Sequence, residues 1–182
     1  MLTEGWETNV LGFWFRDLAP EQWFGTDEEL DRRITDRFGA LHDTIAATDN
    51  AVLCASGETA LAAIIVLDQF ARNMFRGSAK SFAGDAKARA IANAALEAGY
   101  DAAMSGDEKQ FLYMPFMHSE TLADQDRSVE LFTALGREEA LKFAKLHREP
   151  IKAFGQFPHR NAILGRPTSP AERAWIDEHG GF

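Results

Sequence analysis

The densest group of chemically active side chains follows a long apolar run. Residues 59–67 are apolar on every side, which predicts a central, buried helix. Five polar residues continue this helix at three- and four-residue spacing: Asp68, Gln69, Arg72, Asn73 and Arg76. Asp68, Arg72 and Arg76 fall on one stripe, with the two amides on the next. Because buried polar groups need partners, the pattern predicts either an ion pair at the edge of the core or one wall of a polar pocket.

Other segments offer side chains that could complete such a pocket. The candidates are His118, Glu120, Arg127, His147, His159, Arg160 and Asn161. His147 falls within the apolar stripe of its predicted helix, and Pro158 holds the preceding residue extended, so that residues 159–161 arrive on a turn. Each candidate also has a structural alternative: the histidines could be core residues, and Arg160 and Asn161 could cap neighbouring helix ends.

The residue types favour a small anionic ligand. Planar guanidinium groups suit carboxylates and phosphates, so Arg72, Arg76, Arg127 and Arg160 are predicted anion anchors, with Asp68, Gln69, Asn73 and Asn161 beside them. Histidine transfers protons near neutral pH, which makes His118, His147 and His159 the catalytic candidates, with Glu120 as an orienting carboxylate.

Metal binding is the rival chemistry. His118, Glu120, His147 and His159 would be enough ligands if they converged, but no helical His-x-x-x-His or paired-cysteine spacing supports this. Motifs for an activated nucleophile and for a phosphate-binding glycine loop are also missing. We therefore assign no metal ligand, and the sequence names no cofactor.

The elements that must position these residues are helical, since no segment alternates as a strand would. About eight helices are expected, joined by short connections and packed as antiparallel hairpins. Their approximate ranges are 9–17, 27–47, 57–75, 85–97, 107–118, 121–135, 137–154 and a short helix after Ser169-Pro170. No linker divides the chain, so a single all-α domain over residues 1–182 is predicted.

Composition excludes several functions. The net charge is −9 with no basic run, which argues against nucleic acid. No apolar run is long enough to cross a bilayer, and the acidic start lacks the basic region of a signal peptide. The single cysteine, Cys54, fits a reducing compartment, so a cytoplasmic location is expected.

Five segments together resemble a bacterial domain-of-unknown-function family, number 924. They are residues 10–15, 67–77, 113–120, 123–129 and 157–166, which occur in the family's order and span nearly the whole chain. The resemblance implies an all-helical fold of the tetratricopeptide-like superfamily. Two positions depart from the family pattern: Ala71 stands where the family usually has proline, and Gln156 where it commonly has arginine.

Three functions are compatible with these observations. The first is a small enzyme or binding protein for an anionic metabolite. The second is a protein-interaction scaffold, as many tetratricopeptide-like folds are, with Trp6, Trp14 and Trp23 as candidate groove residues if they are not in the core. The third is a polar network that only fixes helix geometry.

Overall fold

The computed structural model describes residues 2–181, and these residues form helices and turns without any strand. The all-α prediction is therefore confirmed, and each of the eight expected helices is present. The chain divides into two compact units, Met1–Pro115 and Phe116–Phe182, which are described in turn. The single domain and the tetratricopeptide-like superhelix stay predictions.

The first unit is built around one long rod. The rod consists of α4 (Gly57–Ile64), a π-helix (Ile65–Phe70) and α5 (Ala71–Met74). Every residue from 60 to 71 is buried, as the all-round apolar sequence predicts. The expected single helix therefore has the right path but contains a six-residue π-helical stretch. Ala71 continues the helix with ordinary α geometry.

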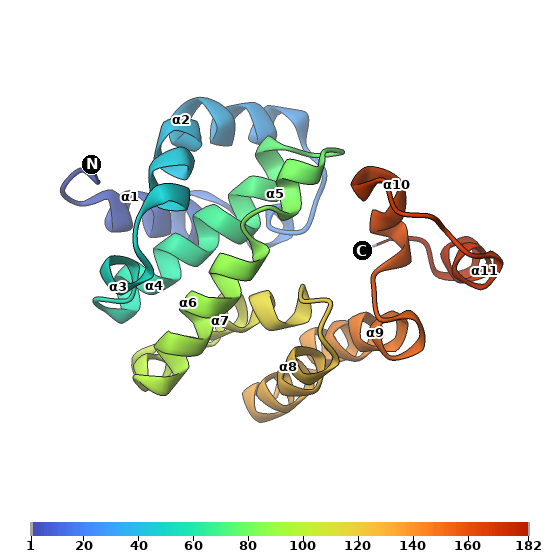
Figure 1. The fold of residues 1–182 in the computed structure, drawn as a ribbon. Coiled ribbons are helices and arrows are strands. Elements are labelled where there is room, and N and C mark those ends of the chain that lie inside the picture. Colours follow the sequence, from blue (N-terminus) through green and yellow to red (C-terminus); the bar gives the residue numbers. More distant parts are fainter. Residues whose placement is uncertain (1, 182) are drawn as a thin grey trace. The chain divides into compact units, whose positions relative to one another are not determined.

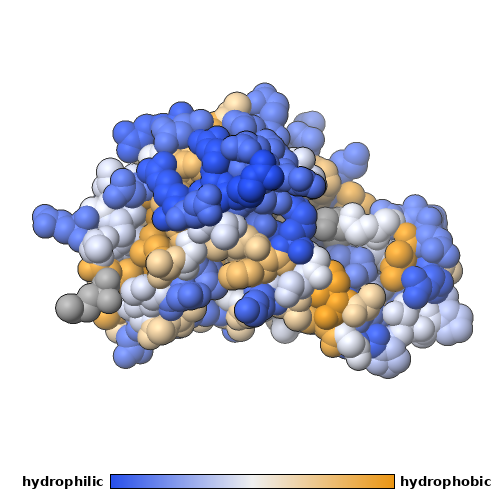
Figure 2. Space-filling model, turned by 90° about the horizontal axis from the view of Figure 1, so that it is seen from above, coloured by the Kyte–Doolittle hydropathy of each residue, from blue (hydrophilic) through white to orange (hydrophobic). Residues whose placement is uncertain are grey.

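Other helices of the first unit surround this rod (Figure 1). They are α1 (Trp6–Gly12), which runs on into a second π-helix (Phe13–Asp17), α2 (Glu28–Ala47), α3 (Asn50–Leu53) and α6 (Asp85–Glu97). Short 3₁₀ helices lie at Pro20–Gln22, Ala79–Phe82 and Tyr100–Ala103. Trp6 and Trp14 are core residues, and Trp23 is half-buried. Figure 2 shows a largely hydrophilic surface where α2 lies, in keeping with the exposed arginines and carboxylates of that helix.

Helix α7 (Gly106–Met117) passes through Pro115 without ending and contributes residues to both units. The second unit continues with α8 (Leu122–Leu135) and α9 (Glu138–Phe154), which form a tight hairpin of the expected kind (Figure 1). Gly136, at φ +73°, makes the turn between them, a backbone conformation that favours glycine. A 3₁₀ turn (Pro158–Arg160), α10 (Asn161–Leu164) and α11 (Pro170–His179) complete the unit.

Local sequence explains where the helices start. Ser56 Oγ accepts a hydrogen bond from the Thr59 N–H at 3.1 Å and so caps α4. Ser169 caps α11 in the same way, and the Glu172 side chain returns a bond to the Ser169 N–H, which completes a capping box. The start of the last helix after Ser169 was expected from the sequence.

Gly84 lies just before α6, where the backbone packs directly against the rod. Among the glycines of residues 2–181, it leaves the least room for a Cβ atom. A Cβ atom at Gly84 would lie 2.5 Å from the carbonyl oxygen of Leu67. We predict that Gly84→Ala lowers the free energy of unfolding by about 1–3 kcal/mol, because the two backbones must separate. Urea denaturation followed by circular dichroism measures this.

Gly39 provides the matched control, since it lies inside α2 and a Cβ atom added there would have no heavy atom within 4 Å. Gly39→Ala should raise stability by about 0.5–1 kcal/mol through helix propensity. Equal effects of the two substitutions would contradict this account of the α6–rod contact.

Candidate functional site

Arg72 joins three segments of the first unit. Its Nη1 donates to the Asp68 carbonyl at 3.0 Å, to the Ser81 carbonyl at 3.2 Å and to Asp85 Oδ1 at 2.9 Å. Its Nη2 donates to Asp85 Oδ2 at 3.1 Å, so the pair with this carboxylate is bidentate. The arrangement matches the structural alternative, an ion pair at the edge of the core that ties α6 to the rod.

The other polar residues of the rod also meet internal partners. Asp68 is fully buried, and its Oδ2 accepts a hydrogen bond from the Gln69 amide. Asn73 and Arg76 both bind Asp31 on α2, at 2.7 Å and 2.8 Å. Arg76 therefore binds the same carboxylate as Asn73, whereas Arg72 binds a different one. The α-helical spacing had predicted Arg76 on the same stripe as Arg72.

In the second unit, two histidines and an arginine lie around the Phe157 ring, and a third histidine lies beside one of them. His147 meets this ring edge-on at a centroid distance of 5.8 Å, and His159 lies 5.5 Å from it. The Arg160 guanidinium stands over the ring at 4.4 Å, and the His118 ring lies 6.0 Å from that of His147. We call these four residues, His118, His147, His159 and Arg160, the histidine cluster.

The members of the histidine cluster come from three separate segments of the second unit. His118 directly follows α7, His147 projects from the middle of α9, and the other two lie on the 3₁₀ turn. His118, His147 and Arg160 are buried, while His159 is half-buried. Gly181 lies close to His159, since a Cβ added there would be 3.4 Å from the Cβ of the histidine.

Burial first, and then the charges of His118, Arg160 and His159, lower the pKa of His147 from 6.5 to about 3, although its hydrogen bond to Phe143 acts in the opposite direction. The His147 Nδ1–H donates to the Phe143 carbonyl at 2.8 Å, since a carbonyl can only accept. This bond fixes the neutral ring with its proton on Nδ1 and its lone pair on Nε2. His147 is thus neutral at physiological pH and is surrounded by positive or protonatable groups.

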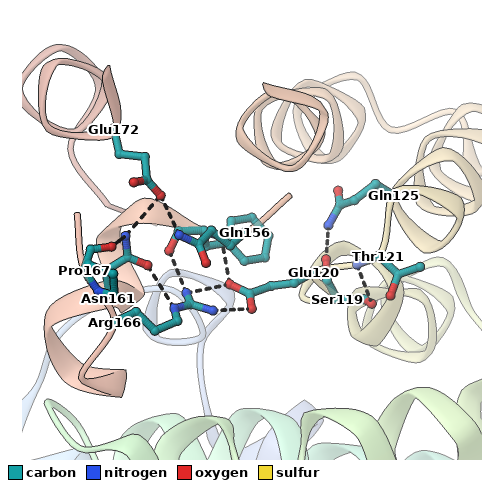
Figure 3. Close-up of polar contacts among 10 residues, drawn as sticks. Ser119, Glu120, Thr121, Gln125, Gln156, Asn161, Arg166, Pro167 and Glu172 are labelled. Carbon is teal, nitrogen blue, oxygen red and sulfur yellow. Dashed lines mark hydrogen bonds and ion pairs between the residues drawn. The ribbon is translucent and has the colours of Figure 1, made fainter. Parts of the chain in front are cut away.

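Glu120 binds the guanidinium of Arg166 at 2.7 Å and 2.9 Å, as Figure 3 shows. Its Oε1 also accepts the Phe157 N–H at 2.7 Å, and Arg166 donates to the Phe157 carbonyl at 3.1 Å. Burial alone would raise the pKa of Glu120, but the bonds from Arg166 and Phe157 outweigh it and hold this pKa below its ordinary value. Glu120 is therefore ionised and positions the Phe157 segment.

Asn161 extends this contact to α11. Its Oδ1 accepts from Arg166 Nε at 2.9 Å, and its Nδ2 donates to Glu172 at 3.1 Å. Glu172 also accepts from Gln156 at 2.6 Å and from Ser169 at 2.8 Å. These hydrogen bonds, from Gln156 first and then from Ser169 and Asn161, lower the pKa of Glu172 to about 2.

The sequence prediction omitted three members of this network: Gln156, Arg166 and Glu172. The Ser169-x-x-Glu172 capping box was a signal that could have found Glu172. The pairing of Arg166 had no local signal, because its carboxylate partner lies 46 residues earlier in the chain.

The predicted site residues therefore fall into distinct groups. Asp68, Gln69, Arg72, Asn73 and Arg76 belong to the first unit, and the others to the second. Within the second unit the histidine cluster converges, Glu120 and Asn161 belong to the Arg166 network, and Arg127 is exposed beside Glu130 at 3.3 Å. Within residues 2–181, no group of three or more His, Cys, Asp or Glu side chains is arranged to hold a metal ion.

Loss of Arg166 should destabilise the protein by about 2 kcal/mol in an Arg166→Ala variant, between the values typical of surface and of buried ion pairs. The reason is that Glu120 and the Phe157 carbonyl lose their donor together. Chemical denaturation at pH 7 tests this, with Arg127→Ala as the control that should change stability by at most about 0.5 kcal/mol. Equal losses would show that the network adds nothing beyond a surface pair.

The buried His147 makes stability depend on pH. Its pKa lies below the ordinary value, so protons favour the unfolded state, and stability present above pH 6.5 is lost as the pH falls toward 3. The expected slope approaches about 1.4 kcal/mol per pH unit. Between pH 6.5 and 5, His147→Asn should flatten this slope, because Asn keeps a donor for Phe143 but does not titrate.

His179→Asn, at an exposed histidine that stacks on Trp175, is the control for the substitution itself. Unfolding free energies measured at several pH values compare the three proteins. The same slope in wild type and His147→Asn would rule out His147 as its source.

Comparison with known proteins identifies the family to which the chain belongs. No curated protein matches it. A solved structure of a protein of unknown function from Agrobacterium tumefaciens is similar over 94% of this chain and 97% of that one, with 38% sequence identity and a TM-score of 0.89. No helix within residues 2–181 combines the length and the apolar composition of a membrane-spanning segment. The model of a family of bacterial proteins of unknown function, DUF924, matches residues 10–180, and the chain therefore belongs to this family.

Proposed function

We propose that the protein binds a small anionic metabolite at the histidine cluster of its second unit and takes up a proton as it does so. The observation that carries this proposal is the convergence of His118, His159 and Arg160 on a buried, neutral His147. Each of the three lowers the pKa of His147 through a positive charge. A carboxylate, sulfate or phosphate would be attracted to the same place.

The position of Arg160 supports this choice. Arg72 and Arg76 pair with Asp85 and Asp31 inside the first unit. Arg160 stands over the Phe157 ring in a cation–π contact, and its charge lowers the pKa of the neighbouring His147. Glu120, the carboxylate nearest in sequence to His118, binds Arg166 and the Phe157 N–H, and the charge of Arg160 also lowers its pKa.

Proton uptake follows from the electrostatics of the histidine cluster. An anion would offset the positive charges that, together with burial, keep the His147 pKa near 3, so the bound form would have a higher pKa. By linkage, affinity for the anion then rises as the pH falls. If the ligand reacts, His147 and His118 are the groups placed to move a proton, while the ionised Glu120 acts as a positioning residue.

Sulfate is the sharpest probe, because its charge stays constant across the pH range in which histidine titrates. At constant ionic strength, calorimetry should detect sulfate binding that strengthens as the pH falls from 6 toward 4, where His147 can take up a proton, with net proton uptake revealed by buffers of different ionisation enthalpy. Succinate and inorganic phosphate extend the test to carboxylates and phosphates. Between the His147 pKa of the free protein and that of the complex, the dependence should approach tenfold in affinity per pH unit for one proton.

Two matched substitutions locate the binding. Arg160→Gln should weaken sulfate binding at least tenfold, as loss of a charge-assisted contact does, whereas Arg127→Gln, an exposed arginine of the same unit, should leave it unchanged. Absence of binding by any of the three anions to the folded wild-type protein, or equal binding by both variants, would refute the proposal.

A further inference from the structure

A cleft of about 760 Å³ opens on the first unit, within the size range of small-molecule sites. Its walls come from α1, the Phe13–Asp17 π-helix, α4, the Tyr100–Ala103 turn and the start of α7. None of the site residues considered above lines it. We infer that this cleft binds a zwitterionic ligand with an apolar substituent, such as an α-amino acid or a short peptide with the same two charged ends.

The apolar part of the ligand has a defined place. Phe15, Leu61, Tyr100 and Met104 contribute hydrophobic surface to the cleft, while small residues leave room between them. Gly57 permits the close packing of α4 on this wall, since a Cβ there would lie 3.1 Å from the Tyr100 Cβ. An apolar or aromatic side chain of the ligand would cover this surface and remove part of it from water, the usual source of affinity in such sites.

The cation of the cleft is Arg16. It projects from the π-helix, a rare geometry that is frequent at functional sites. Among residues 2–181, Arg16 has no carboxylate within ion-pair distance and its guanidinium makes no hydrogen bond, in contrast to Arg72 and Arg76 of the same unit. Arg16 is exposed and lines the cleft, so the N–H groups of its planar guanidinium can donate hydrogen bonds to the carboxylate of a ligand.

Two carboxylates line the same cleft. Glu58 accepts one hydrogen bond from the Thr8 hydroxyl at 3.3 Å, and Glu108 accepts one from the Ser105 N–H at 2.7 Å. A carboxylate offers about four acceptor positions, so both can still receive an ammonium group. A simple anion would be repelled by these two carboxylates, and a simple cation would be repelled by Arg16. A zwitterion can pair its carboxylate with Arg16 and its ammonium group with the glutamates.

Three related probes separate the contributions: phenylalanine, phenethylamine, which lacks the carboxylate, and 3-phenylpropionate, which lacks the ammonium. Phenylalanine should bind at least tenfold more tightly than either analogue. Amide NMR signals of Gly57 and Gly99, both in the cleft wall, should shift during the titration. A leucyl-phenylalanine dipeptide distinguishes the sources: tighter binding of the dipeptide assigns the site to peptides, and tighter binding of phenylalanine to free amino acids.

Substitutions at exposed residues of the cleft can test each charge without disturbing the core. Arg16→Gln should remove the advantage of phenylalanine over phenethylamine, and Glu58→Gln should reduce its advantage over 3-phenylpropionate. Ala103→Phe, which fills the cleft, should abolish binding of all three probes. Arg32→Gln and Glu29→Gln, an exposed pair on α2, are the matched controls and should leave affinities unchanged.

Two results would overturn the inference. One is that neither phenylalanine nor the dipeptide binds the folded wild-type protein at millimolar concentration. The other is that phenylalanine binding survives both Arg16→Gln and Ala103→Phe with unchanged affinity. Sulfate binding to the second unit is independent of either result.

Discussion

The Glu120–Arg166 ion pair is the contact on which the polar architecture of the second unit depends. The two side chains hold the Phe157 backbone between them, one accepting its N–H and the other donating to its carbonyl. The position of the Phe157 ring is therefore fixed, and His147, His159 and Arg160 are arranged around that ring. A contact between side chains distant in sequence thus sets the geometry of the histidine cluster.

The arginines of the two units make different kinds of contact. In the first, Arg72 and Arg76 each meet an aspartate, and the resulting bonds tie α6 and α2 to the central rod. In the second, Arg160 lies on an aromatic ring and acts, with two histidines, on His147. A group of positive or protonatable side chains around a neutral imidazole favours an incoming anion. This arrangement is why we propose ligand binding at the histidine cluster.

Much of the fold could be predicted from local sequence. The apolar residues 59–67 indicate a buried rod, and Ser56 and Ser169 mark helix starts that the structure confirms. The π-helices could not be predicted, because one widened turn hardly alters an apolar pattern. The pairings of Arg72 with Asp85 and of Arg166 with Glu120 depend on tertiary contacts. The sequence identified the polar residues of the candidate site but could not divide them between a structural network and the histidine cluster.

The central claim is that an anion at the histidine cluster changes the protonation of His147. NMR of the imidazole nitrogens, assigned by comparison with His147→Asn, measures this directly during a pH titration with and without sulfate. We predict a His147 ring that stays neutral, with its proton on Nδ1, down to pH 5 in the free protein. With saturating sulfate, its pKa should rise by at least one unit. An identical titration of His147 in both conditions would contradict the account.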